Sequence, residues 1–264
     1  MTVKTIIFDL DDTLLLDEAA VQIAFDRTTS FVSAKYPQID AKLLEEAVRD
    51  RTESLLSSYD IFDFTVQIGI GPYEVLWGEF ADSSLRFPDL RDTAKEFRQM
   101  VWSLAFADVG VPDMRLSKVA AMMFVTIRLE LALAFDDTYE VLDQLKDAGY
   151  QLVLLTNGAP SLQHFKIDKT RKLRQYFDKI LVSGDFGQGK PAPGLFDFTL
   201  TRATAEKAST VMVGDNLFTD ILGANASGII SIWLNRDDKP ANSTVTPDHS
   251  IQSLHELPDL LEKL

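Results

Sequence analysis

The chain has 264 residues, 46% of them hydrophobic, which is enough to bury a full core in one or two domains. Its formal net charge is -14. Such an acidic surface repels nucleic acid and anionic membranes, so we expect neither as a partner. Without cysteine the chain has no disulfides, thiolate catalysis or cysteine-ligated metal, and its three histidines lack ligand spacing. Any resident metal is therefore expected to be a hard, oxygen-liganded cation, with Mg²⁺ the leading candidate.

The first segment is a short apolar run over residues 3–8, which predicts a buried parallel strand. Because this strand follows the first methionine so closely, we expect no secretory leader. The later apolar stretches are all shorter than a bilayer-spanning helix requires. We therefore expect a soluble, cytoplasmic protein.

Three carboxylates follow this strand within four residues, namely Asp9, Asp11 and Asp12. Ligands bind at the carboxyl ends of the strands in open α/β sheets, so these side chains stand where a site is expected. At neutral pH they repel one another and resist desolvation, and a bound divalent metal is the simplest compensation. The alternative is structural, with Asp9 and Asp12 forming a turn that caps the next helix.

After Thr13 the pattern is helical for more than a hundred residues, with apolar residues at steps of three and four and with proline and glycine between the segments. The expected helices cover residues 19–36, 41–59, 73–84, 90–106 and 117–134. Aromatic residues in this block, such as Trp77 and Trp102, could stack on a substrate, but their helical spacing is more typical of a core.

From Asp136 onward helices and strands alternate, which predicts a parallel sheet covered on both faces. The expected strands cover 151–155, 179–182, 210–214 and 229–234, and further helices cover 137–148 and 254–264. We predict a three-layer, Rossmann-like α/β core domain of residues 1–15 and 135–264, with a helical domain of residues 16–134 inserted into it. An inserted domain at the mouth of a site is well placed to act as a lid, although it can also be packing mass.

Polar residues also follow the second and third strands of this predicted sheet. Thr156 and Asn157 precede Gly158, and they offer hydroxyl, amide and backbone N–H donors suited to phosphate oxygens, although an ordinary turn has the same composition. Lys190 lies between glycines and prolines that restrict its loop. It is a candidate partner for the carboxylates and a phosphoryl group, and the alternative is a solvated loop lysine.

The fourth predicted strand ends at Gly214 and is followed by Asp215 and Asp220. With a helix starting near Asn216, Asp220 folds back toward Asp215. Asp215 is then a candidate metal ligand, and Asp220 a neighbour that orients the ligands and Lys190. As an alternative Asp215 is only a helix N-cap, but this role accounts for neither the glycine nor the second acid.

Acids, hydroxyl donors, a lysine and further acids at four strand ends describe a metal-assisted phosphoryl-transfer site. In this order the segments resemble the four motifs of the haloacid dehalogenase (HAD) superfamily, and the helical insertion resembles its C1 cap type. The motif residues are Asp9-Leu10-Asp11-Asp12-Thr13, Thr156, Lys190 and Gly214-Asp215 through Asp220. Three segments are also similar to the pyrimidine 5'-nucleotidase and N-acylneuraminate-9-phosphatase subgroup: Leu154-Leu155-Thr156-Asn157-Gly158, Lys190-Pro191-Ala192-Pro193 with Phe196, and Trp233-Leu234-Asn235.

The resemblance implies a Mg²⁺-dependent phosphatase acting on a small phosphorylated metabolite, such as a nucleotide or a sugar phosphate. Asp9 would attack phosphorus and form an aspartyl phosphate. Asp11 would act as acid and base, and its backbone carbonyl would join Asp9 and Asp215 as a metal ligand. The transferred group would be held by Thr156, the backbone at Asn157 and Lys190, with Asp220 as a supporting neighbour.

Asp11 also separates the reactions found within the superfamily, because attack on carbon needs no acid two residues after the nucleophile, whereas a departing alcohol does. Its presence favours a phosphatase over a dehalogenase. Two alternatives stay open. One is a phosphomutase on the same scaffold, which would release little free phosphate. The other is a regulatory protein that senses a phosphorylated ligand without turnover.

Overall fold

The computed structural model describes residues 2–240 and 243–264 and divides into two compact units. One unit consists of Met1–Leu16 and Leu133–Leu264, and we call it the sheet unit. The other consists of Asp17–Ala132, and we call it the helical unit. None of the helices in the described ranges is both long and apolar enough to cross a membrane.

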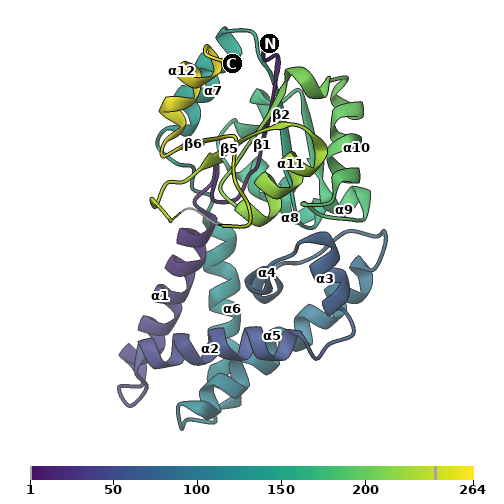
Figure 1. The fold of residues 1–264 in the computed structure, drawn as a ribbon. Helices are drawn as coiled ribbons and strands as arrows, with labels where there is room; N and C mark the ends of the chain where they lie inside the picture. The colour runs from purple at the N-terminus through teal and green to yellow at the C-terminus, as the bar shows by residue number, and fades with distance from the viewer. Residues whose placement is uncertain (1, 241–242) are drawn as a thin grey trace. The chain divides into compact units, whose positions relative to one another are not determined.

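The described part of the sheet unit contains one sheet of six parallel strands in the order β3-β2-β1-β4-β5-β6 (Figure 1). The strands are β1 Thr5–Phe8, β2 Gln151–Thr156, β3 Lys179–Val182, β4 Thr210–Gly214, β5 Ile230–Leu234 and β6 His249–Ile251. Phe8 of β1 stands opposite Leu154 of β2 and Val213 of β4. The carboxyl ends of these three strands therefore lie side by side.

The strands alternate their side chains between two hydrophobic cores, one on each face of the sheet. Ile6 and Phe8 belong to the core that α7, α8 and α12 cover, and Ile7 belongs to the core under α10 and α11. The helices and short turns are α7 Thr138–Asp147, α8 Pro160–Lys169, α9 Ser183–Phe186, α10 Pro193–Ala203, α11 Leu222–Ser227 and α12 Leu257–Leu261, 3-10 turns at Leu173–Tyr176, Lys207–Ser209 and Leu254–Glu256, and a π-helical turn at Leu217–Ile221. The predicted three-layer α/β fold is thus confirmed.

The helical unit consists of helices packed on one another, with α1 against α2 and α6 and with α5 against α2 and α6. Its helices are α1 Asp17–Lys35, α2 Ala41–Leu56, α3 Phe62–Ile68, α4 Pro72–Trp77, α5 Phe87–Asp108 and α6 Met114–Glu130. The predicted helix over 73–84 is wrong beyond Trp77, because Gly78 is extended and Phe80 has a positive φ of 46°. Trp77 and Trp102 are fully buried, which supports the core interpretation of these aromatics.

Two linkers of the sheet unit run side by side where the helical segment leaves and rejoins it. Leu16 N donates to Leu133 O at 2.9 Å, and Phe135 N donates to Leu14 O at 3.1 Å. An antiparallel bridge joins Leu15 to Ala134. The chain therefore leaves and re-enters the sheet unit at one place, so a long segment can be inserted without disturbing the sheet.

Candidate active site

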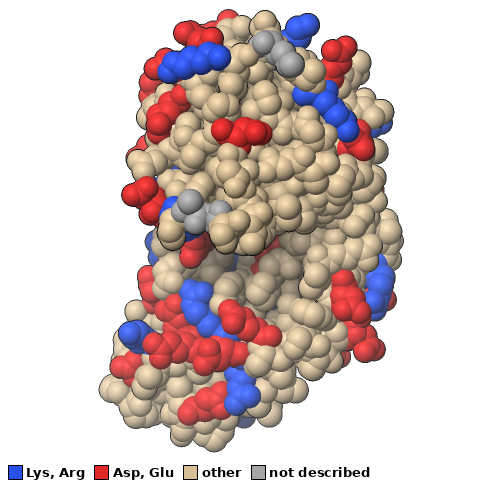
Figure 2. Space-filling view, viewed as in Figure 1, with Lys and Arg blue, Asp and Glu red and all other residues tan. Residues whose placement is uncertain are grey.

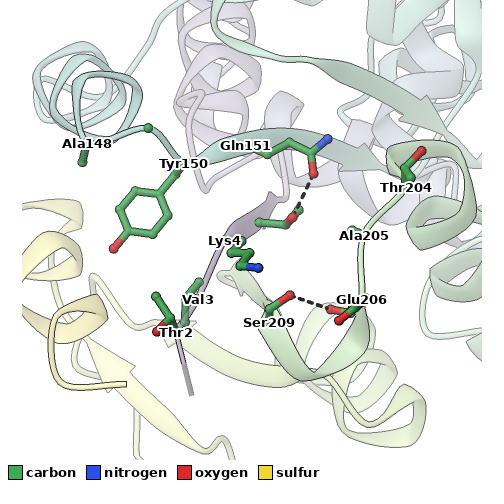
Figure 3. A pocket seen from close by; sticks show the side chains of 12 residues that line it. Thr2, Val3, Lys4, Ala148, Tyr150, Gln151, Thr204, Ala205, Glu206 and Ser209 are labelled. Atoms are coloured by element: carbon green, nitrogen blue, oxygen red, sulfur yellow. Dashed lines mark hydrogen bonds between the residues drawn. The ribbon is translucent and has the colours of Figure 1, made fainter.

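The sheet has polar groups at both of its ends, and a cavity lies at the amino ends of β1 and β2 (Figure 3). Its volume is about 520 Å³, and its lining includes Lys4, Gln151 and Ser209. The Thr5 hydroxyl donates to Gln151 Oε1 at 2.8 Å across the start of the two strands. The predicted site residues are absent from this lining and lie at the opposite ends of the strands. In a parallel sheet the carboxyl ends are the expected place for chemistry.

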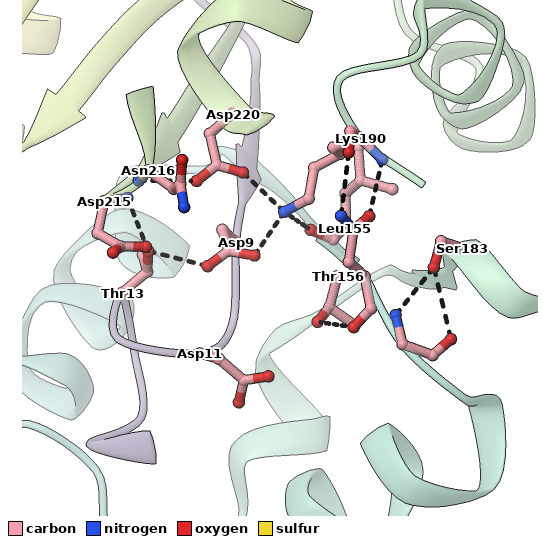
Figure 4. A network of polar contacts seen from close by, with 12 residues as sticks. Asp9, Asp11, Thr13, Leu155, Thr156, Ser183, Lys190, Asp215, Asn216 and Asp220 are labelled. Carbon is pink, nitrogen blue, oxygen red and sulfur yellow. Dashed lines mark hydrogen bonds and ion pairs between the residues drawn. The ribbon is translucent and has the colours of Figure 1, made fainter. Parts of the chain in front are cut away.

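At the carboxyl ends, carboxylates from β1 and β4 converge on the ammonium group of a buried lysine (Figure 4). Lys190 Nζ lies 2.5 Å from Asp9 Oδ1 and 2.7 Å from Asp220 Oδ1, and it donates to Leu155 O at 2.9 Å. One carboxylate oxygen from each of Asp9, Asp215 and Asp220 lies within 4.8 Å of the other two. The structure thus brings these four predicted residues together from loops far apart in the sequence.

Thr13 connects the first and fourth strand ends, although only its place in the first motif was quoted from the sequence. Its hydroxyl lies 3.1 Å from Asp9 Oδ2 and 3.3 Å from Asp215 Oδ1, and it accepts from Asp215 N at 3.1 Å. The intervening loop turns tightly because Asp12 has a φ of 58°, a conformation that Asp tolerates better than most residues. Asp12 therefore takes part in a turn, but α1, the helix that it was considered to cap, begins only at Asp17.

The negative charges in this cluster outnumber the positive ones. Burial raises the pKa of Asp215 to about 8, and the negative charges of Asp9 and Asp220 contribute to this rise. Burial also raises the pKa of Asp220 to about 6, although Lys190 opposes this rise. Burial acts to lower the pKa of Lys190, but the Asp220 and Asp9 carboxylates outweigh it and raise that pKa. An acidic cluster that suppresses its own ionisation is suited to a cation.

The oxygen atoms of this cluster also have the chemistry that a hard divalent cation requires. Asp220 is already engaged, because Oδ1 lies against Lys190 and Oδ2 accepts from Asn216 N at 3.1 Å. The Asp215 carboxylate, by contrast, is held at 3.3 Å by the Thr13 hydroxyl and lies beside Asp9. Asp9 likewise contacts Lys190 through Oδ1 and accepts from the Thr13 hydroxyl through Oδ2 at 3.1 Å, so these contacts do not separate Asp9 from Asp220, and the three carboxylates together offer oxygen ligands for a metal.

Asn157, at the end of β2, positions the loop that carries Lys190. Its Oδ1 accepts from Lys190 N at 2.7 Å and its Nδ2 donates to Lys190 O at 3.1 Å. The next residue, Gly158, has a φ of 130° and donates its N–H to Ser183 Oγ at 2.9 Å. The side chain of Asn157 is thus used within the protein, which leaves its backbone as the part expected to meet a phosphate.

Asp11 and Thr156 lie together beside α8, and two polar residues of this helix connect them. The Asp11 carboxylate points away from that of Asp9 (Figure 4). Its Oδ2 lies 2.9 Å from both Lys166 Nζ and Gln163 Nε2, and the same amide nitrogen donates to Thr156 Oγ1 at 2.7 Å. Neither Gln163 nor Lys166 was predicted as a site residue from the sequence. The sequence signal that could have indicated them is their spacing of three residues, which places both on one face of the helix that follows the end of β2.

Known proteins resemble this chain over nearly its whole length. The family model of haloacid dehalogenase-like hydrolases matches residues 3–228. A phosphoserine phosphatase of Thermus thermophilus is 29% identical over 254 residues, which cover 96% of this chain and 97% of that protein. An N-acylneuraminate-9-phosphatase of Mus musculus is 26% identical over 266 residues, which cover 99% and 95%.

A solved structure has the same fold. The crystal structure of the Bacillus subtilis HAD-hydrolase YfnB bound to magnesium matches with a TM-score of 0.68 at 21% identity, and the match covers 99% of both chains. The resemblance drawn from the motifs is thereby confirmed, including its likeness to the N-acylneuraminate-9-phosphatases. The chain belongs to the family of haloacid dehalogenase-like hydrolases.

Proposed function

We propose that this protein is a Mg²⁺-dependent phosphatase that hydrolyses a small phosphorylated metabolite, such as a nucleotide or a sugar phosphate, through an aspartyl phosphate. The observation that carries the proposal is the position of Asp9, whose carboxylate lies 2.5 Å from buried Lys190 and within 4.8 Å of an Asp215 oxygen. The family and its phosphatase relatives make the chain a phosphoric monoester hydrolase. The names of these relatives support a small phosphorylated substrate.

In the first step an Asp9 oxygen forms a bond to phosphorus while the bond from phosphorus to the ester oxygen breaks. Asp11 gives its proton to the leaving oxygen, so the product departs as a neutral alcohol. In the second step a water oxygen attacks phosphorus, the bond to Asp9 breaks, and Asp11 takes a proton from the water. The cycle returns both carboxylates to their starting state and releases inorganic phosphate.

Fixed donors stabilise the charge that spreads over the phosphoryl oxygens in both steps. We assign this role to the Thr156 hydroxyl, the Asn157 backbone N–H and the Lys190 ammonium. Mg²⁺ held by Asp9, Asp215 and the Asp11 carbonyl would supply further positive charge at these oxygens. Asp220 keeps Lys190 in place through its 2.7 Å contact.

The test is phosphate release from a panel of nucleoside monophosphates, sugar phosphates and acyl-sugar phosphates, with Mg²⁺ and with a chelator. We expect turnover of at least one class, loss of activity on chelation, and recovery on adding Mg²⁺. Asp9→Asn should lower kcat by at least about 10³-fold, because it removes the nucleophile. The matched control is Asp259→Asn, on the surface of α12, which should keep wild-type activity. A near wild-type rate in the Asp9 variant would rule out Asp9 as nucleophile, and isomerisation without phosphate release would indicate a mutase.

A further inference from the structure

Helix α8 carries two polar side chains that are buried beside the proposed acid and base. Gln163 is fully buried and Lys166 is 3% exposed, while Leu162 and Ile167 on the same helix are buried as ordinary apolar residues. Burying an ammonium group and an amide costs free energy unless each has partners. Lys166 Nζ and Gln163 Nε2 both lie 2.9 Å from the same oxygen, Asp11 Oδ2. The helix thus presents two converging donors to one carboxylate.

The Gln163 amide is shared with the proposed phosphate site. Its Nε2 also lies 2.7 Å from Thr156 Oγ1 and 2.6 Å from Asn157 O. A carboxylate and a carbonyl can only accept, so these contacts fix which end of the amide carries the nitrogen. Two N–H hydrogens therefore serve three acceptors, of which Asp11 is the most distant. A stronger bond to any one acceptor weakens the others.

We propose that Lys166 and Gln163 are positioning residues that hold the Asp11 carboxylate beside the phosphoryl group, and that Gln163 couples Asp11 to the occupancy of Thr156. This inference rests on the proposed function, which gives Asp11 and Thr156 their roles. Because Asp11 and Thr156 accept from one nitrogen, the group that must reach the leaving oxygen is held next to the group that must reach the phosphoryl oxygens.

Binding of a phosphoryl group changes the sharing of the amide hydrogens. When the Thr156 hydroxyl donates to a phosphoryl oxygen, its own oxygen becomes a better acceptor, because hydrogen bonds in a chain polarise one another. Gln163 then bonds more strongly to Thr156 and more weakly to Asp11. With its proton on the other oxygen, Oδ1, the Asp11 carboxyl group keeps the contact of Oδ2 with Lys166 but gains freedom to move toward the leaving oxygen, so substrate binding itself readies the acid.

The leaving group distinguishes this positioning role from a purely structural one. The ratio kcat/KM reports the steps up to departure of the leaving alcohol, where an alkyl oxygen needs the Asp11 proton and the weakly basic p-nitrophenolate oxygen does not. We therefore expect Lys166→Met to lower kcat/KM for alkyl phosphates at least about tenfold more than for p-nitrophenyl phosphate, since a small misplacement of an acid is costly. A structural defect would lower both equally.

Three further variants complete the test. Lys169→Met is the matched control, because this lysine is exposed at the end of the same helix, and it should behave as wild type. Gln163→Leu should show the same leaving-group bias and, in addition, weaker inhibition by inorganic phosphate, since Gln163 also contacts Thr156. In an Asp11→Asn background, Lys166→Met should produce no further leaving-group bias, because the group that it positions is gone.

The outcomes separate this inference from the proposed function. If wild-type enzyme releases no phosphate from any ester, the proposed function fails. If the wild type is active but Lys166→Met and Gln163→Leu slow all esters equally, or if Lys166→Met adds a further leaving-group bias in the Asp11→Asn background, only the positioning inference is overturned. Circular dichroism shows whether Lys166→Met is folded at the assay temperature. If it is unfolded, the same criteria are applied to Gln163→Leu, both alone and combined with Asp11→Asn.

Discussion

At the scale of single residues, Lys190 is what makes the acidic cluster tolerable. An ammonium group has three hydrogens to donate, and Lys190 directs them to Asp9, Asp220 and the Leu155 carbonyl at 2.5, 2.7 and 2.9 Å. Its side chain is only 2% exposed. Removing one partner of an ion pair this deeply buried leaves charges with no compensation.

Replacing Lys190 with Met should therefore destabilise the fold strongly, by about 3–5 kcal/mol in the free energy of unfolding without added metal. The matched control is Lys207→Met, because Lys207 makes a 2.7 Å ion pair with Asp197 while both side chains are about half exposed. That change should cost no more than about 1 kcal/mol. Urea unfolding of both variants in a chelating buffer makes the comparison, and equal losses would contradict the account of Lys190.

The residues that meet in the site differ in how visible they were in the sequence. Asp9 and Asp215 stood out because charged side chains directly after apolar strands are costly there without a use, and Lys190 stood out because glycines and prolines restrict its loop. Gln163 and Lys166 were hidden, because polar residues on a helix usually face solvent, and only tertiary packing buries these two. Thr13 was hidden for a related reason, since a hydroxyl four residues after an acid is ordinary until β4 brings Asp215 to it.

At the scale of elements, the segment after β5 anchors the acidic loop through Arg236. Its guanidinium makes a two-pronged contact with Asp137, at 2.9 and 3.0 Å, and donates to Thr13 O at 3.1 Å. It also lies 3.8 Å from the centre of the Phe135 ring. Asp137 in turn accepts from Ser253 Oγ at 2.9 Å. The loop that bears Asp9 is thus fixed to the start of α7 and to the C-terminal segment.

This anchor gives stability that depends on pH. Burial opposes the ionisation of Asp137, but Arg236 and Ser253 outweigh it, so the pKa of Asp137 lies below its ordinary value of 3.8. A carboxyl group whose pKa is lower in the folded state than in the unfolded state stabilises the fold. Its full contribution is present at pH values above the unfolded-state pKa, and the contribution is lost as the pH falls through the folded-state pKa.

Asp137→Asn should therefore lower the free energy of unfolding by about 1.5–3 kcal/mol at neutral pH, the range for hydrogen bonds to charged groups. The difference from wild type should stay constant from pH 8 to about pH 5 and shrink below pH 3.8. Urea unfolding across this range measures it. A difference that grows toward low pH would show that the Asp137 carboxylate does not stabilise the fold through its charge.

Whether a helix or strand could be predicted from the sequence depended on its length and on the backbone geometry at its ends. Strands β3 and β4 were predicted with the bounds that the structure has, because each is a short apolar run followed directly by a polar residue, Ser183 or Asp215. Strand β6 was missed, since its three residues contain a single buried apolar side chain, Ile251. Helix α3 was missed within a long helical pattern that breaks where Gly69 adopts a φ of 80°.

At the scale of the whole molecule, the sheet unit is assembled from two segments that are far apart in the chain. The central strand β1 pairs with β2 so that Thr5 stands opposite Gln151, although the whole helical unit separates the two strands in the sequence. The sequence prediction of a core domain interrupted by a helical block rested on the change from helical spacing to alternating helices and strands. On the face shown in Figure 2, the blue Lys and Arg side chains lie next to red Asp and Glu side chains.

The central claim is that Asp9 carries the phosphoryl group between the two chemical steps. Its most direct test is acid quenching of the enzyme during turnover of a ³²P-labelled ester, followed by mapping of the label. We expect label on the peptide that contains Asp9, removable by hydroxylamine as an acyl phosphate is, and no label in Asp9→Asn. A burst of released alcohol without matching label on that peptide, or label on another residue, would contradict the account.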